Sequence, residues 1–348
     1  PGGAGRVGLL RRYPVGPIAA ITPYNFPLNL VAHKLAPAMA AGCPVVLKPA
    51  PQAPSPALLV GEIAVAAGWP PGALSVLPLA VTDAAPLIDD PRLRMLTFTG
   101  SPAVGWALKA RVPRKKVTLE LGGNAGVIIH DDADLAAAAA KCAVGGFSYA
   151  GQSCIAVQRI FVSRAVHDAF LGEFLPRVRA LVTDHPLSES ADLCALISAA
   201  EAARVAEWLE EARHGGARVL CGGRVHGHVV EPTVLAGAAP EARVNAAEVF
   251  APVVTVAAYD TFDEALARVN AGRFGLQAGV FTRDRALIAR AFDTLEVGGV
   301  MIEETPTWRL DPMPYGGVKD SGFGREGVRW AIEEMTEPRL LALPADLA

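Results

Sequence analysis

The sequence predicts an α/β protein of two domains, the first built on a doubly wound parallel sheet. The chain of 348 residues is long for a single core, and its 51% hydrophobic content supports a large buried interior. Short apolar runs alternate with segments of helical pattern along the chain. Most of these runs are apolar throughout, which is typical of parallel strands covered by helices on both faces.

The first half of the chain alternates between strand and helix signals. A helix is expected after residues 23–27, up to about residue 41, and another over 57–67. Apolar runs predict strands over residues 16–22, 43–47, 74–77, 95–98 and 117–121. The uncharged run 63–82 is long enough to span a bilayer, but a Trp-Pro-Pro-Gly turn at 69–72 interrupts it. We therefore expect helix, turn and strand there, and no membrane segment.

The second half repeats the alternation and predicts a second α/β domain, with a boundary near residues 122–123. Acidic residues start an alanine-rich helix over 131–144. Ser198 with Glu201, and Thr261 with Glu264, form capping boxes at the starts of two further helices. The remaining expected elements are helices over 166–181, 198–213, 261–270 and 285–295, and strands over 157–162, 253–257, 278–281 and 300–302.

Charge and cysteine content exclude some classes of partner and compartment. The net charge is −3 and no basic cluster is present, which argues against a nucleic-acid partner. The five cysteines are scattered, without a Cys-x-x-Cys pair, which is typical of reduced thiols in a cytoplasmic protein. Pro1 is not a natural start, so a preceding segment is expected and targeting by that segment stays open.

The stretch from Glu120 to Cys154 carries the strongest chemical signal. A carboxylate stands beside two glycines in Glu120-Leu121-Gly122-Gly123, where a backbone can approach a ligand closely. Cys154 closes a Gly-Gln-Ser-Cys loop between a helix and a strand, a suitable place for a nucleophile. Together they suggest covalent catalysis, with a thiolate that attacks and a base that activates water. Taken alone, a cysteine is more often a small buried hydrophobe, and the glycine pair could be an ordinary strand end.

Other marked residues also stand at the ends of expected strands. Asn25, Lys48, Ser101 and Glu120 share this position, and parallel sheets bind ligands at the carboxyl ends of their strands. Ser101 followed by Pro102 reads as a helix start suited to a pyrophosphate, although Gly100 and Gly105 do not complete a G-x-G-x-x-G fingerprint.

Two further motifs have alternative readings. Asn25 could cap a turn, or it could donate its amide to an oxyanion. The pair His226-Gly227-His228 has no accompanying carboxylate or cysteine cluster, so a surface loop is expected and no metal site.

An ordered set of motifs closely resembles the aldehyde dehydrogenase superfamily. The motifs are PYNFP, KPA, FTGS, ELGGNA, GQSC, EVFAPV and PYGGVKDSGFGREG, and the resemblance runs from about Gly8 to about Leu341. The wording around Cys154 is similar to the branch of lactaldehyde-type enzymes. The resemblance implies a Rossmann-like cofactor domain over 13–121, a catalytic domain over 122–320, and oligomerisation strands and a tail at 1–12 and 330–348. It also implies a homo-oligomer, dimer or tetramer.

The resemblance implies an NAD(P)-dependent oxidation of an aldehyde to a carboxylic acid. Cys154 would attack the carbonyl, and the oxyanion would be held by the Asn25 amide and the Cys154 backbone N–H. Glu120 would activate the water that hydrolyses the thioester. Lys34 and Glu326 match positions linked to proton transfer and base support. The implied contacts to NAD or NADP are Thr22, Pro23, Tyr24, Lys48, Gly100, Ser101, Gly105, Leu121, Gly122, Glu248 and Phe250.

Several departures from the family pattern bear on these roles. Pro51 stands where the family often has a glutamate that grips the adenosine ribose, and Leu79 replaces an expected glycine. Glu303 replaces an asparagine. The first helices and strands of the family have no counterpart, so we expect extra exposed apolar surface on the cofactor domain, aggregation and weak cofactor binding for this chain alone.

Two alternatives stay open at this point. A CoA-acylating dehydrogenase would intercept the thioester with a thiol, but Glu120 argues against it. An inactive remnant is the non-enzymatic alternative, because the family's first elements are missing.

Overall fold

The computed structural model describes residues 3–348, which divide into two compact units. The first unit contains residues 1–119, 311–314 and 324–348, and the second contains residues 120–310 and 315–323. The predicted oligomerisation segment 1–12 lies in the first unit, apart from residues 1 and 2, which are outside the described residues. The roles expected for the domains stay predictions.

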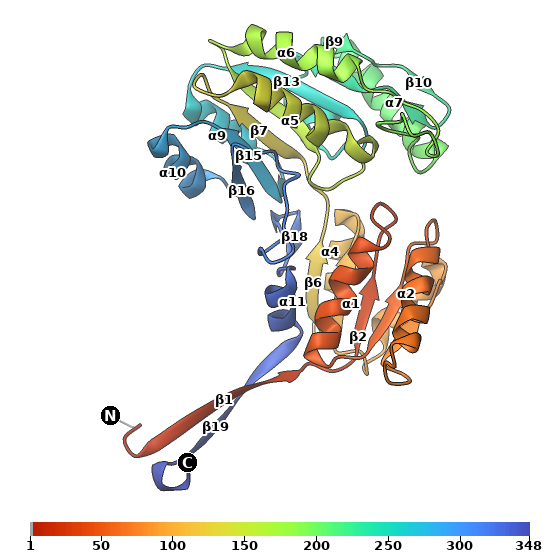
Figure 1. Cartoon of the computed structure of the whole chain (residues 1–348), viewed down its shortest axis with the longest axis vertical. Coiled ribbons are helices and arrows are strands. Elements are labelled where there is room, and N and C mark those ends of the chain that lie inside the picture. Colours follow the sequence, from red (N-terminus) through yellow and green to blue (C-terminus); the bar gives the residue numbers. More distant parts are fainter. Residues whose placement is uncertain (1–2) are drawn as a thin grey trace. The chain divides into compact units, whose positions relative to one another are not determined.

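The first unit is built on a sheet with the strand order β6-β5-β2-β3-β4 (Figure 1), whereas the two-residue strand β18 (Gly322–Phe323) belongs to the second unit. The strand pairs β2–β3, β2–β5 and β3–β4 are parallel. The sheet strands are β2 (Ile18–Ile21), β3 (Val45–Lys48), β4 (Leu74–Val76), β5 (Met95–Thr99) and β6 (Lys116–Glu120). The helices of this unit are α1 (Asn29–Ala41), α2 (Ser55–Ala66), α3 (Ala85–Asp89), α4 (Pro102–Arg111) and α11 (Val328–Glu334), with short 3₁₀ turns at Val81–Ala84 and Ala345–Leu347.

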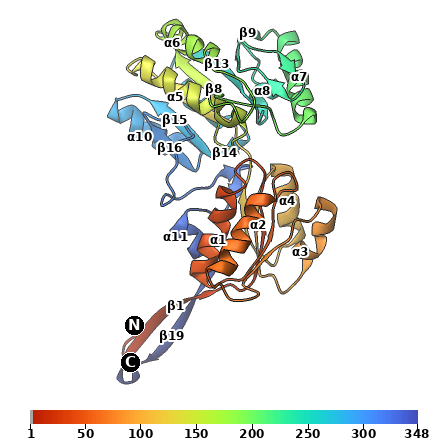
Figure 2. The ribbon, with the colours of Figure 1, turned by 45° about the vertical axis from the view of Figure 1, so that its right-hand side comes forward.

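A separate two-stranded ribbon joins the two ends of the described chain. Strand β1 (Arg6–Pro14) pairs antiparallel with β19 (Thr336–Pro344), and the two run side by side in both views (Figures 1 and 2). Leu10 and Leu340 face each other in this register and are exposed by 70% and 66%. The pairing is the one that the resemblance implies, and its part in oligomerisation stays a prediction.

The second unit contains a seven-stranded sheet with the order β16-β15-β7-β8-β13-β12-β9, parallel except for β9. Its strands are β7 (Ala125–Ile129), β8 (Val157–Ser163), β9 (Arg218–Cys221), β12 (Thr233–Ala236), β13 (Val253–Tyr259), β15 (Gln277–Phe281) and β16 (Gly299–Ile302). Its helices are α5 (Leu135–Phe147), α6 (His167–Arg179), α7 (Ala199–His214), α8 (Arg243–Ala246), α9 (Phe262–Asn270) and α10 (Arg285–Thr294). Small strand pairs complete it: β10 (Val225–His226) with β11 (Val229–Val230), and β14 (Phe274–Gly275) with β17 (Val318–Lys319).

Alternation along the central strands places a hydrophobic core on each face of this sheet. Val127 and Ile129 point to the face covered by α5 and α6, where Phe170 and Phe174 stack at 5.3 Å between ring centroids. Ile128, from the same strand, points to the face covered by α9 and α10. Because both faces are buried, these strands are apolar throughout, as predicted. The doubly wound α/β class is confirmed.

Two expectations about individual elements differ from the structure. The helix expected over 131–144 begins at Leu135, because the side chain of Asp134 caps it by accepting a hydrogen bond from the Ala137 N–H (3.0 Å). The buried strand β7 was not expected as a separate element. Among residues 3–348, no helix has both the length and the hydropathy that crossing a bilayer requires. The uncharged run 63–82 forms the end of α2, a turn and β4.

Candidate active site

The loop that carries Cys154 begins with an unusual backbone. After α5, Tyr149, Ala150 and Gly151 all have left-handed φ angles, of 56°, 52° and 68°. Such a conformation costs roughly 1–2 kcal/mol for each residue other than glycine. A Cβ at Gly151 would lie 2.2 Å from the carbonyl oxygen of Ala251, so this position also requires glycine for space. The chain then continues through Cys154, which is partly exposed, into β8.

The two glycines after Glu120 are required by close approaches of main chain and carboxylate. A Cβ at Gly123 would lie 2.0 Å from the carbonyl oxygen of Cys154. A Cβ at Gly122 would lie 2.2 Å from a carboxylate oxygen of Glu248. The segment after β6 therefore packs directly against both the Cys154 loop and Glu248, and no larger residue fits at either position.

Glu248 is held in place by residues to which the sequence alone assigned no role. Its Oε1 accepts a hydrogen bond from the Gly123 N–H (2.8 Å). The Asn124 side chain donates to the carbonyl oxygen of Asn245 (2.5 Å), and Gln158 donates to the carbonyl of Ala247 (2.7 Å). Asn124 lies in the ELGGNA motif, and Gln158 follows the GQSC motif. Their positions beside glycines and in an apolar strand are the sequence features that could have indicated buried polar roles.

Phe250, the expected neighbour of the cofactor ring, lies two residues after Glu248. Its φ of 51° is left-handed, which is uncommon for an aromatic residue and indicates a conformation imposed by its surroundings. The side chain of Leu121 is buried in the core. Its backbone N–H donates to the carbonyl oxygen of Ser321 (2.9 Å).

Tyr315 is a residue of this site to which the sequence analysis assigned no role. Its hydroxyl lies 3.1 Å from the Sγ of Cys154, and its ring is 3% exposed. Ile155 and Leu276 pack with it, and the guanidinium of Arg309 lies 3.6 Å above its ring centroid. The Pro-Tyr-Gly-Gly motif was quoted for the resemblance, but nothing in the spacing indicated that its phenol reaches the cysteine.

Electrostatics keep the Cys154 thiol protonated in the resting protein. The pKa of Cys154 is raised to about 12, chiefly by burial, with smaller contributions from the negative charges of Glu248 and Glu120. The hydrogen bond with Tyr315 and the charge of Arg309 lower the pKa. The site thus places two carboxylates beside the sulfur, which can receive a proton, and two groups that stabilise a thiolate.

The cofactor residues expected in the first unit gather at the carboxyl edge of its sheet. Thr22 follows β2, Lys48 ends β3, and Ser101 is the N-cap of α4 after β5; these three strands are adjacent. Pro23 and Tyr24 continue the loop after Thr22, together with Asn25. The Ser101 side chain makes no capping hydrogen bond, so the first N–H groups of α4 are available to an anion.

Lys48 provides a specific test of whether this edge suits a dinucleotide. Its side chain is 4% exposed, and burial lowers the pKa of its ammonium group. Its Nζ donates to the carbonyl oxygen of Pro49 (3.4 Å), and within residues 3–348 no carboxylate pairs with it. A buried lysine without a counter-ion, at the same edge of the sheet as the N-terminus of α4, fits a phosphate-bearing cofactor.

Gly100 and Gly105, also expected near the cofactor, serve the start of α4. Gly100 faces the Phe98 ring, which a Cβ would meet at 2.6 Å, and Gly105 is buried within the helix.

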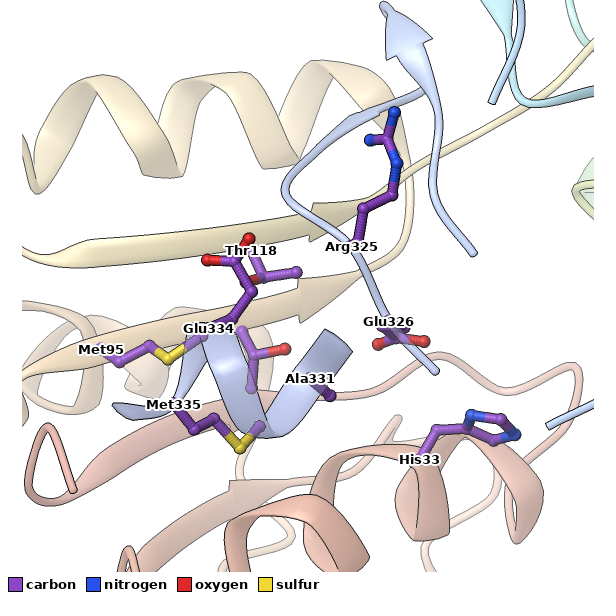
Figure 3. Close-up of a pocket in the computed structure, with 9 residues that line it drawn as sticks. His33, Met95, Thr118, Arg325, Glu326, Ala331, Glu334 and Met335 are labelled. Atoms are coloured by element: carbon purple, nitrogen blue, oxygen red, sulfur yellow. The ribbon is translucent and has the colours of Figure 1, made fainter. Parts of the chain in front are cut away.

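Lys34 and Glu326 form a buried ion pair within the first unit. Lys34 Nζ lies 3.0 Å from Glu326 Oε1 and donates to Thr97 Oγ1 (2.9 Å). Figure 3 shows Glu326 at a small cavity that His33, Thr118 and Arg325 also line. The two residues expected to support proton transfer are therefore in contact. Their link to the reaction stays a prediction.

The raised pKa of Glu248 yields a testable prediction about stability. Burial raises this pKa to about 7, against the opposing effects of the Gly123 N–H and the Arg204 charge. The stabilising contribution of the protonated form is complete below about pH 4.5 and is lost as the pH rises through about 7. Glu248→Gln should therefore match the wild type near pH 4. Near pH 8, urea unfolding should show it to be more stable by about 1–3 kcal/mol.

The matched control for this prediction is Glu189→Gln, which changes an exposed carboxylate of the same unit. A stability difference for Glu248→Gln that is the same at both pH values would contradict the prediction.

Comparison with known proteins places this geometry in a family. The model of the aldehyde dehydrogenase family matches residues 1–341. The 3-sulfolactaldehyde dehydrogenase of Priestia aryabhattai is 44% identical over 347 residues, which are 99% of this chain and 72% of the relative. A lactaldehyde dehydrogenase of Methanococcus aeolicus is 38% identical, over 94% of this chain and 72% of that relative. The expected similarity to lactaldehyde-type enzymes is confirmed.

Solved structures agree with the sequence comparison. Aldehyde dehydrogenase 21 from Physcomitrella patens, in complex with the reaction product succinate, is 43% identical with a TM-score of 0.96. The alignment covers 98% of this chain and 72% of that chain. The glyceraldehyde-3-phosphate dehydrogenase GapN from Methanocaldococcus jannaschii, complexed with NADP, is 36% identical with a TM-score of 0.94, over 98% and 75% of the two chains. The chain belongs to the aldehyde dehydrogenase family.

Proposed function

We propose that the enzyme oxidises an aldehyde to a carboxylic acid through a covalent adduct on Cys154. The observation that carries the proposal is the placement of Cys154 within one unit, beside Tyr315 and under the electrostatic influence of Glu120 and Glu248. A nucleophile, proton acceptors and a stabilising donor therefore occupy the same site. Membership of the family supports the same chemistry.

The proposed reaction has two stages. The Cys154 thiol gives its proton to a base, and its sulfur attacks the carbonyl carbon while the carbonyl electron pair moves to oxygen. Among residues 3–348, no acceptor takes the backbone N–H of Cys154, which leaves it able to donate to that oxygen. Oxidation of the adduct leaves a thioester on Cys154. Glu120 then removes a proton from the water that attacks the thioester, which releases the acid.

The cofactor proposed for this reaction is NAD or NADP. When bound, its nicotinamide supplies the hydride acceptor. Lys48, Ser101 and the N-terminus of α4 would hold its phosphates, because they offer a buried cation and free N–H groups. Glu248 and Phe250 are proposed to contact its ribose and ring, a role that rests on the resemblance. Asn25 is proposed as the side-chain donor to the oxyanion on the same basis.

The two stages can be separated by mutation. Cys154→Ala should abolish oxidation, because no other nucleophile can form the adduct. Glu120→Gln should give a burst of reduced cofactor followed by turnover slowed by about 100-fold or more, because the thioester forms but is not hydrolysed. Stopped-flow absorbance with mass spectrometry of the acylated protein measures both effects.

Cys221→Ala provides a matched control, since it removes a thiol far along the chain from Cys154. Full steady-state activity in Cys154→Ala or Glu120→Gln would contradict the role proposed for that residue. A product assay that detects acyl-CoA instead of free acid would favour the acylating alternative.

Cofactor choice follows from the residues after β3. Pro51 provides no carboxylate to repel a 2′-phosphate, and the ammonium of Lys48 is nearby in sequence. We expect NADP to be used at least comparably with NAD, as measured by kcat/KM for both cofactors. Pro51→Glu should shift the ratio toward NAD by about tenfold or more, through like-charge repulsion. A wild-type preference for NAD above about a hundredfold, roughly 2.7 kcal/mol, would show the argument to be wrong.

We further propose that the substrate is a short aldehyde that carries an anionic group. Two relatives are named for the anionic aldehydes 3-sulfolactaldehyde and glyceraldehyde-3-phosphate, and aldehyde dehydrogenase 21 is in complex with its anionic reaction product succinate. Arg309 supplies a positive charge that acts on Cys154, and it lies on the 303–310 segment of the second unit. A guanidinium at this place can bind a carboxylate, sulfonate or phosphate with two parallel hydrogen bonds.

Arg309→Gln should therefore weaken the binding of anionic substrates and leave the binding of neutral substrates nearly unchanged. KM for succinate semialdehyde should rise by about 10- to 100-fold, the range for a lost charged hydrogen bond, while KM for a neutral aldehyde such as propanal changes little. Arg283→Gln is the matched control, because it removes an exposed guanidinium of the same unit. Equal losses for anionic and neutral aldehydes would refute the anion-binding role.

A further inference from the structure

The contact between Tyr315 and Cys154 defines which group donates to the sulfur at each protonation state of the thiol. The Tyr315 hydroxyl lies 3.1 Å from Sγ, a normal distance for a hydrogen bond to sulfur, and either atom can be the donor while the thiol is protonated. Tyr315 itself is 3% exposed and packs against Ile155 and Leu276, so its ring cannot swing away without opening the core beside the site.

The backbone near Tyr315 is fixed as tightly as its ring. A Cβ at Gly298 would lie 1.8 Å from the carbonyl oxygen of Gly316, so these two segments are in direct contact. The N–H of Gly298 donates to the carbonyl oxygens of Gly275 and Leu276 (3.1 and 2.9 Å). The backbone that carries the phenol therefore packs against a segment anchored to the end of β14 and to the residue that follows it, which fixes the position of the hydroxyl relative to Sγ.

When the thiol loses its proton, only one direction of this hydrogen bond remains. A thiolate has no hydrogen to give, so the phenol O–H must donate. The pKa of Tyr315 is raised well above its usual value by burial, and by the negative charges of Cys154 and Glu120, so the phenol keeps its proton. A hydrogen bond to an ionised acceptor is roughly twice as strong as a neutral one, so deprotonation of Cys154 strengthens this contact.

Arg309 acts in the same direction through its contact with the Tyr315 ring. Its guanidinium carbon lies 3.6 Å from the ring centroid, a close cation–π arrangement. A cation over the ring draws electron density from it and makes the phenol a better donor. The groups that face Cys154 are then two that favour the thiolate, Tyr315 and Arg309, and two that oppose it, Glu120 and Glu248.

We propose that Tyr315 is a catalytic residue whose hydroxyl donates a hydrogen bond to the Cys154 thiolate and stabilises it for attack on the aldehyde. In this step the S–H bond breaks, the proton goes to a base, and the electron pair stays on sulfur while Tyr315 retains its own proton. As the S–C bond forms, the negative charge moves to the carbonyl oxygen and the Tyr315 contact weakens to a neutral one. The inference rests on the proposed role of Cys154 as the nucleophile.

Alkylation of Cys154 by iodoacetamide tests the proposal without any turnover. The rate is followed residue by residue with peptide mass spectrometry on the full-length enzyme. Tyr315→Phe keeps the ring and its packing but removes the donor, which should raise the Cys154 pKa by about one to two units. A less acidic thiol is also a better nucleophile, which offsets about half of the effect. The net rate below the inflection should fall by roughly three- to fifteen-fold.

The design includes controls within the same molecule. Cys142 is fully buried in the core of the second unit, so its lack of labelling shows that the unit stays folded. Tyr13→Phe is the matched variant, because Tyr13 also lies under an arginine, Arg339 at 3.9 Å, but belongs to the β1–β19 ribbon. It should leave the Cys154 rate unchanged.

A second substitution keeps the test decisive if Tyr315→Phe perturbs folding. A ring-fluorinated tyrosine at position 315 preserves the shape and is a stronger donor, so it should raise the Cys154 rate. An unchanged or faster rate in the phenylalanine variant, with Cys142 protected, would overturn the proposal, and so would a fluorinated variant that does not react faster. Loss of activity in Cys154→Ala is a separate measurement, so failure of the nucleophile assignment and failure of the Tyr315 assignment are distinguishable.

Discussion

The close approach of backbone segments at Gly122 and Gly123 is the constraint on which the site of the second unit depends. The carbonyl of Cys154 and the carboxylate of Glu248 both occupy space that a side chain would need. Because the main chain fills that space instead, the Gly123 N–H can donate to Glu248, and the end of β6 brings Glu120 to the same place. The left-handed turn at Tyr149, Ala150 and Gly151 supplies the matching approach from the other side. The packing of Ala150 in the core offsets the energetic cost of the strained backbone at these residues.

The groups around Cys154 have opposing effects on the pKa of its thiol. Burial and two carboxylates favour the thiol, whereas a phenol and a guanidinium favour the thiolate. A thiol that is protonated at rest is protected from oxidation and from unwanted electrophiles, since the thiolate is the reactive form. A small change in any of the four groups then moves the balance, so the reactivity of the sulfur depends on the whole shell and not on one partner.

The sequence allowed much of the fold to be predicted, because its strands are apolar runs and its helices begin at recognisable caps. Ser198 and Thr261 accept hydrogen bonds from the N–H groups three residues ahead, as the capping boxes indicated. The missed strand β7 follows Gly-Gly-Asn directly, and nothing in that short run separates it from the end of β6. Cys154 and Glu120 were predictable from motifs. Tyr315, Asn124 and Gln158 were not, because their roles depend on contacts between segments far apart in the chain. Glu303 shows the reverse case: an asparagine was expected there, and its φ of 54° explains why an asparagine would suit that backbone.

The division of the chain between the two units has a consequence for biosynthesis. The first unit needs residues 324–348 as well as 1–119, since β19 pairs with β1 and Met335 packs in the same core as Ile18 and Leu47. The second unit needs no residue beyond 323. On the ribosome, the unit whose synthesis begins first is therefore the last to obtain all of its parts. Its apolar strands stay incompletely covered while the entire second unit is translated. The contacts that complete the first unit, such as that of Met335 with the core that contains Ile18, join residues more than 300 positions apart. During this interval the first unit lacks the strand and helix that complete its core.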